Sequence, residues 1–517
     1  MIDVTALTYS YPGATSPALD EVSLSLPQGE LHVVSGASGG GKSTLLRCLN
    51  GLIPHFHGGT YSGMVQVDGR STIDTKPRDL ADVIGFMGQN PEDHAVVDRV
   101  EDDIAFGLEN LGVDRSTMRK RVEEALDALG IASLRDRRID TLSGGERQRA
   151  AIAAVMAMMP RYLVMDEPTS QLDPQSAEEV IGAILRLRDE AGLGVVVAEH
   201  RLERFLQYAE TLTVVDRGRI ATGSPGTVLE KSSGGPPIVV LGRAMGWRPL
   251  PLGLRDARRL VNSRQRPTRP LPSVAPAPPP GGPMISLDSL TVTVAGRPVV
   301  RDVDLAVAEG ETVALMGRNG SGKSTLLRAL TGAYKHHRGR IVGTRSIGYL
   351  PQDPASVLFR RSVAEELGSA LSTRDPRTIE EAARLFGIEE HLASYPRDLS
   401  GGQRTRVAIA STACMWPRLL LLDEPTRGLD DEGKRYLQWL TETWRDRGGA
   451  VVLATHDVEL AALVATRVIL LSEGQVIVDG TPTQVLADSL TFSTQMNKIF
   501  EDPNVLTITD ALAAMRQ

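Results

Sequence analysis

The sequence predicts an α/β protein made of two similar domains in tandem, and three observations support this prediction. The chain of 517 residues exceeds what one hydrophobic core usually supports. The same short motifs occur in the same order in both halves of the chain. In each half, apolar runs of strand length alternate with helical patterns, as they do in folds with a parallel sheet. We therefore interpret the chain as an internal duplication.

A glycine-rich loop is the clearest repeated element. It reads GASGGGKST at 36–44 and GRNGSGKST at 317–325. In the first copy the segments at 22–26 and 31–35 predict strands before the loop, and STLLRCLNGL predicts a helix after it. An LSGG motif and a strand-terminal DEPT motif follow in both copies. The second copy is the shorter one between its loop and its LSGG motif.

Later apolar runs complete the predicted core. They have the length of strands and are almost wholly apolar, which predicts buried parallel strands at 161–165, 194–198, 418–422 and 450–454. We expect a first domain at 1–233, a linker at 234–283 and a second domain at 284–517.

The expected linker contains the sequence RPTRPLPSVAPAPPPGGP, in which proline removes backbone donors and disfavours helix and sheet. Two interpretations fit it equally well. Extended polyproline segments would make a semi-rigid spacer between two domains that meet face to face, whereas a disordered tether would have no geometric role.

Composition excludes several classes of protein. The formal net charge of -7 argues against a protein whose main partner is a nucleic-acid backbone, because such binding needs uncompensated basic residues. The two cysteines, Cys48 and Cys414, are too few for a disulfide framework or a cysteine zinc site, which fits a reducing compartment. We expect both to be core residues.

Neither a signal peptide nor a spanning segment is visible. The first residues, MIDVTALTYSYP, lack a basic region followed by an apolar stretch. The most apolar segments, 150–159 and 464–471, fall short of the roughly 18 apolar residues that a spanning helix needs. We expect the chain to be cytoplasmic and to reach a membrane only through a partner.

Both glycine-rich loops satisfy the pattern G-x-x-x-x-G-K-[ST], in which backbone N–H groups and a helix N-terminus surround phosphate oxygens. Two matches in the same strand, loop and helix context make an ordinary glycine-rich turn a poor explanation. The expected ATP-binding residues are Gly36, Ala37, Ser38, Gly39, Gly40, Gly41, Lys42, Ser43, Thr44, Gly317, Arg318, Asn319, Gly320, Ser321, Gly322, Lys323, Ser324 and Thr325. The two lysines should reach the β- and γ-phosphates, and the two serines should offer a hydroxyl to Mg²⁺.

A pair of acidic residues ends an apolar strand in each copy. Asp166 and Asp423 are placed to hold the water shell of Mg²⁺ beside the phosphate loop. Glu167 and Glu424 come next, and each is a candidate general base for the attacking water. Solvated acidic residues at a strand end would explain one such pair but not two that continue into Pro-Thr and Leu-Asp.

With these motifs the chain resembles the ATP-binding cassette (ABC) ATPases of the transporter class over nearly all of both halves. LSGGE at 142–146 and LSGGQ at 399–403 match the signature motif of that family. The resemblance implies that each cassette has a RecA-like α/β core, a β-subdomain and an α-helical signature subdomain.

The resemblance also implies a head-to-tail pair of cassettes, in which the signature of one caps the ATP held by the other. Site one would combine Lys42, Asp166 and Glu167 with Ser400, Gly401 and Gly402. Site two would combine Lys323, Asp423 and Glu424 with Ser143, Gly144 and Gly145. A serine hydroxyl and glycine N–H groups at a helix start suit a γ-phosphate.

Four further residues take roles from the resemblance. Gln89 and Gln352 match the glutamines that sense Mg²⁺ and link the site to the transport partner. His200 and His456 match the switch histidines that contact the γ-phosphate. A lone histidine after a strand is usually an ordinary residue, but here each cassette has one after a late apolar strand.

One position departs from the family pattern. The family stacks adenine on an aromatic residue near the start of each cassette, and Tyr11 matches it, but the aligned residue of the second copy is Val294. We expect site two to bind ATP more weakly than site one. The signature variant LSGGE faces that same site.

Segment 89–113 resembles the ATPases of energy-coupling factor importers, which take up vitamins and transition-metal ions. NGLIPHFHGG and AEHRLE resemble fused two-cassette ATPases for thiamin-precursor uptake. The implied partners are a transmembrane coupling protein and a small membrane substrate-binding subunit. Glu92 and Asp93 could attract basic residues of the coupling protein, or form an ordinary solvated acidic loop.

Two alternatives remain open from the sequence. A fused sugar or nucleoside importer ATPase often has one degraded site, whereas both acidic pairs are intact here. A soluble cassette protein that acts on ribosomes or DNA usually has a charged helical linker or zinc-binding cysteines, and this chain has a proline-rich linker and two cysteines. The resemblance implies that selectivity belongs to another subunit, so we do not expect this chain to encode the transported substrate.

Overall fold

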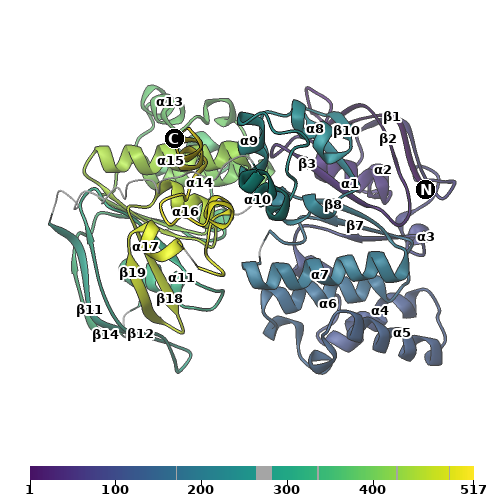
Figure 1. Cartoon of the computed structure of the whole chain (residues 1–517), viewed down its shortest axis with the longest axis horizontal. Coiled ribbons are helices and arrows are strands. Elements are labelled where there is room, and N and C mark those ends of the chain that lie inside the picture. Colours follow the sequence, from purple (N-terminus) through teal and green to yellow (C-terminus); the bar gives the residue numbers. More distant parts are fainter. Residues whose placement is uncertain (171, 264–281, 335–336, 427–428, 488, 517) are drawn as a thin grey trace. The chain divides into compact units, whose positions relative to one another are not determined.

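The computed structural model describes residues 1–170, 172–263, 282–334, 337–426, 429–487 and 489–516. The chain divides into two compact units, Met1–Gly253 and Leu254–Gln517 (Figure 1). Each unit contains an antiparallel sheet, a six-stranded mixed sheet and a group of helices, as the duplication predicts.

The first unit has two sheets. The antiparallel sheet has the strand order β2-β1-β4-β5. The six-stranded sheet has the order β10-β9-β3-β8-β7-β6, and all neighbours in it are parallel except β10 and β9. The strands are β1 (Ile2–Ser10), β2 (Leu19–Leu26), β3 (Leu31–Gly36), β4 (Thr60–Val67), β5 (Arg70–Ser71), β6 (Ile84–Met87), β7 (Tyr162–Asp166), β8 (Gly194–Ala198), β9 (Thr211–Asp216) and β10 (Arg219–Gly223).

Helices of the first unit form two groups. α1 follows β3 directly, whereas α4, α5 and α6 pack against one another as a separate helical layer beside α7 (Figure 1). The α-helices are α1 (Lys42–Leu49), α2 (Leu52–His55), α3 (Pro77–Leu80), α4 (Val100–Asn110), α5 (Arg115–Ala128), α6 (Gly144–Met156), α7 (Pro174–Ala191), α8 (Pro225–Lys231) and α9 (Pro237–Ala244).

The second unit repeats this arrangement. Its antiparallel sheet has the order β12-β11-β14, and its six-stranded sheet has the order β15-β16-β17-β13-β18-β19. The strands are β11 (Pro283–Val294), β12 (Arg297–Ala308), β13 (Thr312–Met316), β14 (His337–Gly343), β15 (Ile347–Leu350), β16 (Leu419–Asp423), β17 (Ala450–Ala454), β18 (Arg467–Ser472) and β19 (Gln475–Gly480). Most of the length difference between the copies lies where the first unit has α3 and β5.

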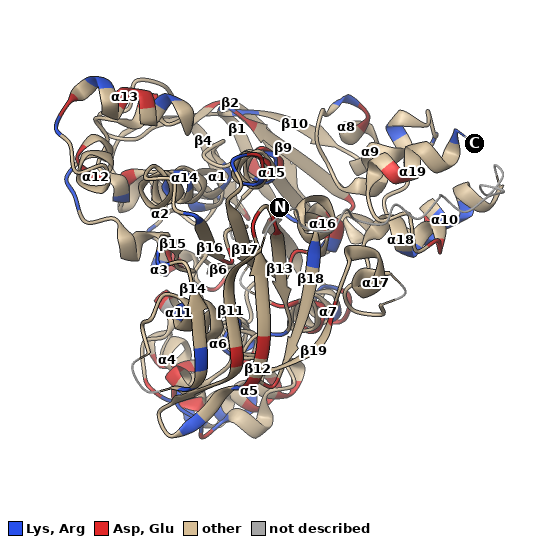
Figure 2. Cartoon of the chain, turned by 90° about the vertical axis from the view of Figure 1, so that its left-hand side faces the viewer, with Lys and Arg blue, Asp and Glu red and all other residues tan. Residues whose placement is uncertain are grey.

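Helices of the second unit correspond to those of the first. α11 follows β13, and α12, α13 and α14 form the helical layer. α13 carries both acidic and basic residues (Figure 2), and Ala383 is its buried residue. The α-helices are α10 (Leu254–Ser263), α11 (Lys323–Leu330), α12 (Val363–Ala370), α13 (Pro376–Leu385), α14 (Gly401–Ala413), α15 (Asp431–Asp446), α16 (Val458–Val464), α17 (Pro482–Leu486), α18 (Gln495–Phe500) and α19 (Ile508–Met515).

The predicted α/β core is confirmed. The apolar runs chosen from the sequence form β7, β8, β16 and β17, and every residue of these four strands is buried. Each strand lies between two neighbours in its sheet, so its backbone donors and acceptors are paired while both faces are covered.

Part of the expected linker is helical. α9 and α10 both lie within 234–283, although the proline content predicts extended backbone there. α10 packs against α18 in the second unit, and its Arg258 Nε donates to the carbonyl of Lys498 at 2.7 Å. The prolines concentrate after α10, at 264–281, and this part of the expected linker lies outside the described residues.

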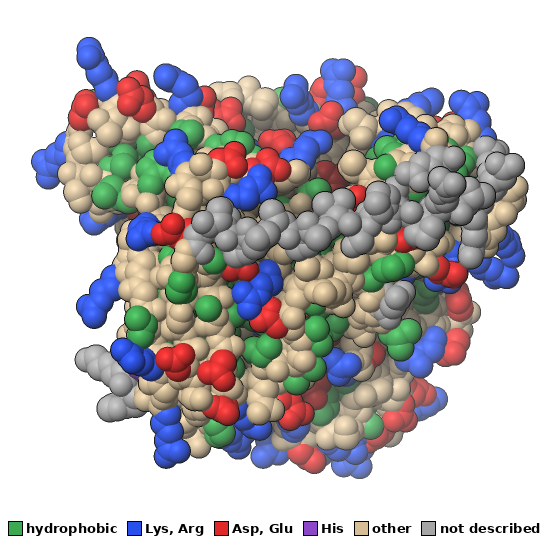
Figure 3. All heavy atoms as spheres, turned by 60° about the vertical axis from the view of Figure 1, so that its left-hand side comes forward, with side chains coloured by type: hydrophobic (Ala, Val, Ile, Leu, Met, Phe, Trp, Pro, Cys, Tyr) green, Lys and Arg blue, Asp and Glu red, His purple; other side chains and the backbone are tan. Residues whose placement is uncertain are grey.

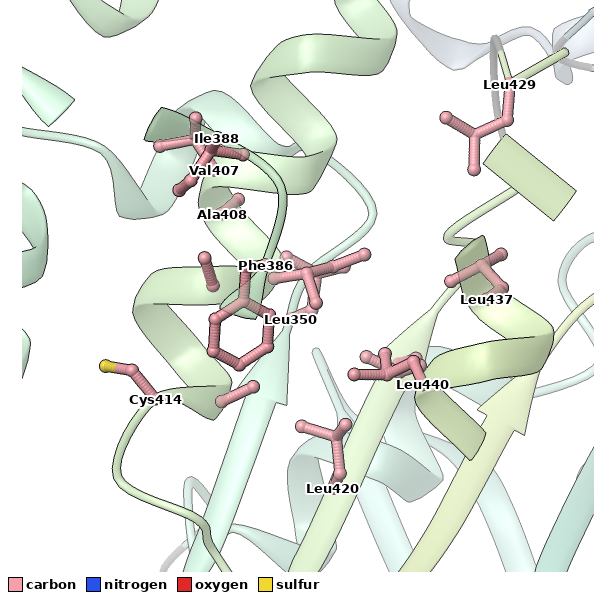
Figure 4. Close-up of a cluster of buried hydrophobic side chains, with 14 of the residues drawn as sticks. Leu350, Phe386, Ile388, Val407, Ala408, Cys414, Leu420, Leu429, Leu437 and Leu440 are labelled. Carbon is pink, nitrogen blue, oxygen red and sulfur yellow. The ribbon is translucent and has the colours of Figure 1, made fainter. Parts of the chain in front are cut away.

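The core of the second unit joins its helical layer to its sheet. Figure 4 shows Leu350 and Leu420 on the strands facing Phe386, Leu437 and Leu440 from the helical segments. Both cysteines are buried, as expected for core residues. Burial raises the pKa of the Cys48 thiol, and it raises that of Cys414 to about 11.

Candidate active sites

The two phosphate loops connect a central strand to a helix and need glycine at their first position. Gly36 has a φ of +142°, and a Cβ there would lie 2.0 Å from the carbonyl oxygen of Val215 on the adjacent strand. Gly317 has a φ of +146°, and its Cβ would lie 2.2 Å from the carbonyl oxygen of Leu471. Any side chain would therefore push the loop away from the sheet.

The lysine of each loop folds back over the loop. Lys42 Nζ donates to the carbonyls of Gly36 at 2.8 Å and Ala37 at 3.0 Å. In the second unit Lys323 Nζ donates to Gly317 at 2.8 Å and Arg318 at 3.1 Å. Each ammonium thus lies over its own phosphate loop, where its positive charge suits a polyphosphate.

The acidic residues lie at the ends of β7 and β16. Burial raises the pKa of Asp166, and a hydrogen bond from Ser43 opposes this rise. Asp166 Oδ1 is buried without a hydrogen-bond partner among the described residues. In the second unit Ser324 Oγ donates to Asp423 Oδ1 at 3.0 Å. A buried carboxylate oxygen beside a hydroxyl is the donor set that Mg²⁺ and its water shell prefer, so these residues fit that ion.

Glu167 is held between the two residues that the family pattern places around it. Gln89 Nε2 donates to Glu167 Oε2 at 2.9 Å, and His200 Nε2 lies 3.0 Å from Glu167 Oε1. Burial alone would raise the pKa of Glu167, but the contact with His200 and the charge of Lys42 lower it overall. Glu167 is therefore ionised at neutral pH, as a proton acceptor must be.

The second unit brings the equivalent pair together in a different way. His456 presents Nδ1 to Glu424 Oε2 at 2.7 Å, whereas His200 presents Nε2 to Glu167. Lys323 Nζ lies 4.0 Å from Glu424 Oε1. Both glutamates have a φ near +50°, a left-handed backbone that turns the carboxylate back toward the loop. Gln352 follows β15 as Gln89 follows β6, and it is exposed.

The contact between Tyr349 and Asp423 belongs to none of the sequence motifs. Tyr349 Oη donates to Asp423 Oδ2 at 3.2 Å and receives a hydrogen bond from Arg328 Nε at 3.3 Å. The first copy has Phe86 at the place of Tyr349. Aligning the two copies position by position would have shown this difference, because both residues lie three positions before the glutamine.

Tyr11 lies against the first phosphate loop. Its hydroxyl lies 3.1 Å from Thr44 Oγ1. Strand register supports its alignment with Val294, because Tyr9 pairs with Leu19 as Val292 pairs with Val300. Val294 is 38% exposed and leaves this place in the second unit without an aromatic ring.

The LSGG motifs begin α6 and α14. Ser143 and Ser400 are the N-cap residues, and each accepts a hydrogen bond from the backbone of the residue three positions on. Glu146 and Gln403 complete a capping box in the same way, so the LSGGE and LSGGQ variants have the same helix start. Glu146 differs by its charge, which also faces Arg137 at 3.5 Å.

Two copies of a phosphate loop, strand-end acidic pair and capped signature helix define a two-cassette P-loop ATPase. The family model described as ABC transporter matches residues 19–170 and 300–427. The chain belongs to the ABC transporter family, as an ATPase that binds ATP with Mg²⁺.

Curated relatives cover the whole chain. An ABC transporter ATP-binding protein of Streptomyces avermitilis is 42% identical over 100% of both chains. A second such protein, from Streptomyces coelicolor, is also 42% identical over 100% of both chains. The expectation of two fused ABC cassettes is thus confirmed.

A solved complex of the archaeal ribosomal stalk protein aP1 and the archaeal ribosome recycling factor aABCE1 contains a similar chain. The match has a TM-score of 0.61 at 22% identity and covers 93% of this chain and 90% of that chain. This likeness supports the two-cassette fold and nothing about partners.

Proposed function

We propose that this chain is the ATP-hydrolysing subunit of a membrane importer of the energy-coupling factor type, for a vitamin or a transition-metal ion. The observation that carries the ATPase part is the contact of Glu167 with both Gln89 and His200. The importer type rests on the resemblance of segment 89–113 and on relatives described as ABC transporter ATP-binding proteins.

In this proposal each cassette binds and orients ATP with its own loop. Lys42 and Lys323 hold the β- and γ-phosphates, and Ser43, Asp166, Gln89, Ser324, Asp423 and Gln352 surround the metal. Bound Mg²⁺ would neutralise charge on the phosphate oxygens. Glu167 and Glu424 accept the proton of the attacking water, while His200 and His456 hold those carboxylates and face the γ-phosphate.

The proposal includes composite sites. The loop of each cassette would be capped by the signature of the other, with Ser400, Gly401 and Gly402 at site one and Ser143, Gly144 and Gly145 at site two. Each N-cap serine accepts a hydrogen bond within its helix and so retains its own proton for a phosphate oxygen. The free amides of the first turn add further donors.

The proposed partners are a transmembrane coupling protein and a small membrane substrate-binding subunit, with the chain at the cytoplasmic face. No helix among the described residues is long and apolar enough to span a bilayer. An exposed apolar side chain occupies the same place after the glutamine of each copy, Val96 at 60% and Phe359 at 76% exposed. Acidic and basic side chains are interspersed on the face shown in Figure 3, which gives a nucleic acid no continuous basic surface there.

Cell fractionation tests the importer assignment. A tagged chain should sediment with membranes and lose that association in the double variant Val96→Asp and Phe359→Asp. Leu490→Asp is the matched control, because Leu490 is 98% exposed elsewhere in the second unit and should leave the distribution unchanged. Recovery of the wild-type chain with ribosomes would contradict the importer and favour the soluble alternative. If the co-purified membrane proteins lack a small substrate-binding subunit, the result favours a sugar or nucleoside importer instead.

A further inference from the structure

A buried carboxylate, that of Glu199 in the segment AEHRLE, lies next to His200 and has no role in the proposed hydrolysis. Glu199 is 1% exposed at the end of β8, and its own amide donates to the carbonyl of Val34 at 3.0 Å. A charged side chain is almost never buried in this way unless it is paired and hydrogen-bonded. Its position therefore demands a set of partners.

Those partners come from two loops. On one side, Glu199 Oε1 accepts hydrogen bonds from the amide of Thr169 at 3.1 Å and from the Thr169 hydroxyl. On the other, Glu199 Oε2 accepts from the amides of His200 at 3.2 Å and Arg201 at 3.4 Å. One carboxylate thus joins the loop after β7 to the loop after β8.

A cation completes this network. Arg204 Nη1 donates to the carbonyl of Thr169 at 2.6 Å. Burial raises the pKa of Glu199, and the charge of Arg204 is the largest influence that lowers it. Because Thr169 lies two positions after Glu167, and His200 follows Glu199 directly, the network fixes the backbone on both sides of the Glu167–His200 contact.

The second copy lacks both charges. Thr455 stands at the place of Glu199 and Leu460 at the place of Arg204. Among the described residues, the corresponding loops meet through the hydroxyls of Thr426 and Thr455, 3.5 Å apart, which is a weak hydrogen bond at best. The ion pair in this region joins Asp457 to Lys434 of α15 at 2.8 Å. In this second copy the histidine, His456, also presents its other ring nitrogen, Nδ1, to the glutamate. The charged network and the Nε2 contact therefore occur together in the first cassette.

We infer that Glu199 is a positioning residue of the first active site, which with Thr169 and Arg204 clamps the loop of Glu167 to the loop of His200. This inference rests on the proposed roles of Glu167 and His200. The clamp holds the histidine ring with Nε2 against the carboxylate while nucleotides exchange, without touching ATP itself. Among the described residues of the second cassette, no carboxylate at the place of Glu199 joins the two loops, so the two cassettes differ in how the pair is held.

Steady-state ATPase measurements on the full chain test the clamp. Glu199→Thr copies the residue of the second cassette, and Glu199→Gln keeps an oxygen that accepts the same amides. Glu203→Gln is the matched control, because Glu203 lies in the same loop outside the network. The variants are compared in the Glu424→Gln background, or in the wild-type background if Glu424→Gln alone stops turnover.

We expect Glu199→Thr to lower kcat about tenfold or more while KM for ATP stays within about twofold, because misplacement of a catalytic group slows the chemical step and leaves binding intact. Glu199→Gln should recover much of the lost kcat, and Glu203→Gln should match its background. A general loss of structure would instead lower the melting temperature and move KM and kcat together without recovery by Gln, and this result would overturn the inference.

The test separates this inference from the proposed function. If Glu167→Gln stops hydrolysis while Glu199→Thr leaves kcat unchanged, the clamp is wrong and the catalytic assignment stands. If Glu167→Gln retains wild-type turnover, the proposed base is wrong, whatever Glu199→Thr does.

Discussion

At the scale of single residues, the expected adenine-stacking position is occupied by Tyr11 in the first cassette and by Val294 in the second. Base stacking on an aromatic ring is worth about 1 to 3 kcal/mol where it has been measured in other complexes. Tyr11→Ala should therefore weaken ATP binding at site one by about fivefold or more, and Val294→Tyr should tighten site two by a similar factor. ATP titration in the Glu167→Gln, Glu424→Gln background measures both.

Tyr11→Phe is the control for this prediction. It keeps the ring but removes the hydroxyl that lies 3.1 Å from Thr44, so it should bind ATP like the wild type if stacking dominates. Unchanged affinities in Tyr11→Ala would contradict the prediction and show that another side chain covers the adenine.

A site residue can be predicted from the sequence when it belongs to a contiguous motif. The phosphate loops and acidic pairs are contiguous motifs, and the structure places Lys42, Asp166 and Glu167 around one strand edge as the motifs imply. Glu199 bonds to Thr169 in another loop, and Tyr349 bonds to Asp423 and Arg328 in other elements, so no contiguous motif contains these contacts. The catalytic roles of Lys42, Asp166 and Glu167 are proposals.

At the scale of elements, each helical layer begins with a carboxylate that binds the preceding loop. Asp103 in the first turn of α4 accepts from the amides of Val96 at 2.8 Å and Val97 at 3.2 Å. Glu366 in α12 accepts from Phe359 and Arg360 in the same way. These bonds fix the loop that carries the exposed Val96 or Phe359.

Asp103→Ala should therefore loosen that loop. Two partly buried amides lose their acceptor, at a cost of about 1 to 3 kcal/mol, so hydrogen exchange at 96–97 should accelerate by about tenfold or more. Asp103→Asn should behave nearly as the wild type, because its amide oxygen still accepts. Glu109→Ala, on the exposed side of α4, should leave exchange unchanged. Unaltered exchange in Asp103→Ala would show that other contacts hold the loop.

Strands were easier to predict than helices in this chain. Strands β7, β8, β16 and β17 are covered on both faces, so nearly every residue is apolar and the runs stand out. α10 buries only Ala257 and Val261, and its charged remainder precedes a proline-rich stretch. The apolar positions of α10 follow a helical spacing, but the proline content of the whole segment 234–283 favours the prediction of extended backbone.

At the scale of the whole molecule, the sequence shows two cassettes because the motifs recur in order. It does not show how the cassettes cooperate, since that depends on surfaces far apart in the chain. The differences between the copies, at Tyr11, Glu199 and Phe86 in the first, lie within each cassette's own site. If the sites are composite, the signature motif that each site receives from the opposite cassette is a further difference between the two ATP sites.

Ser400→Arg tests this composite arrangement. Arginine in place of the N-cap serine removes the hydroxyl offered to the γ-phosphate and fills the space beside it, which should reduce nucleotide trapping at the Lys42 site by about tenfold or more. Ser143→Arg is the reciprocal control and should act on the Lys323 site. Photo-crosslinked ATP, assigned to each loop after proteolysis, reports the two sites separately. Loss at both sites is compatible with coupled composite sites, so the decisive result is the selective one. Loss confined to the Lys323 site in Ser400→Arg would mean that each signature serves its own cassette, and the head-to-tail pairing would have to be abandoned.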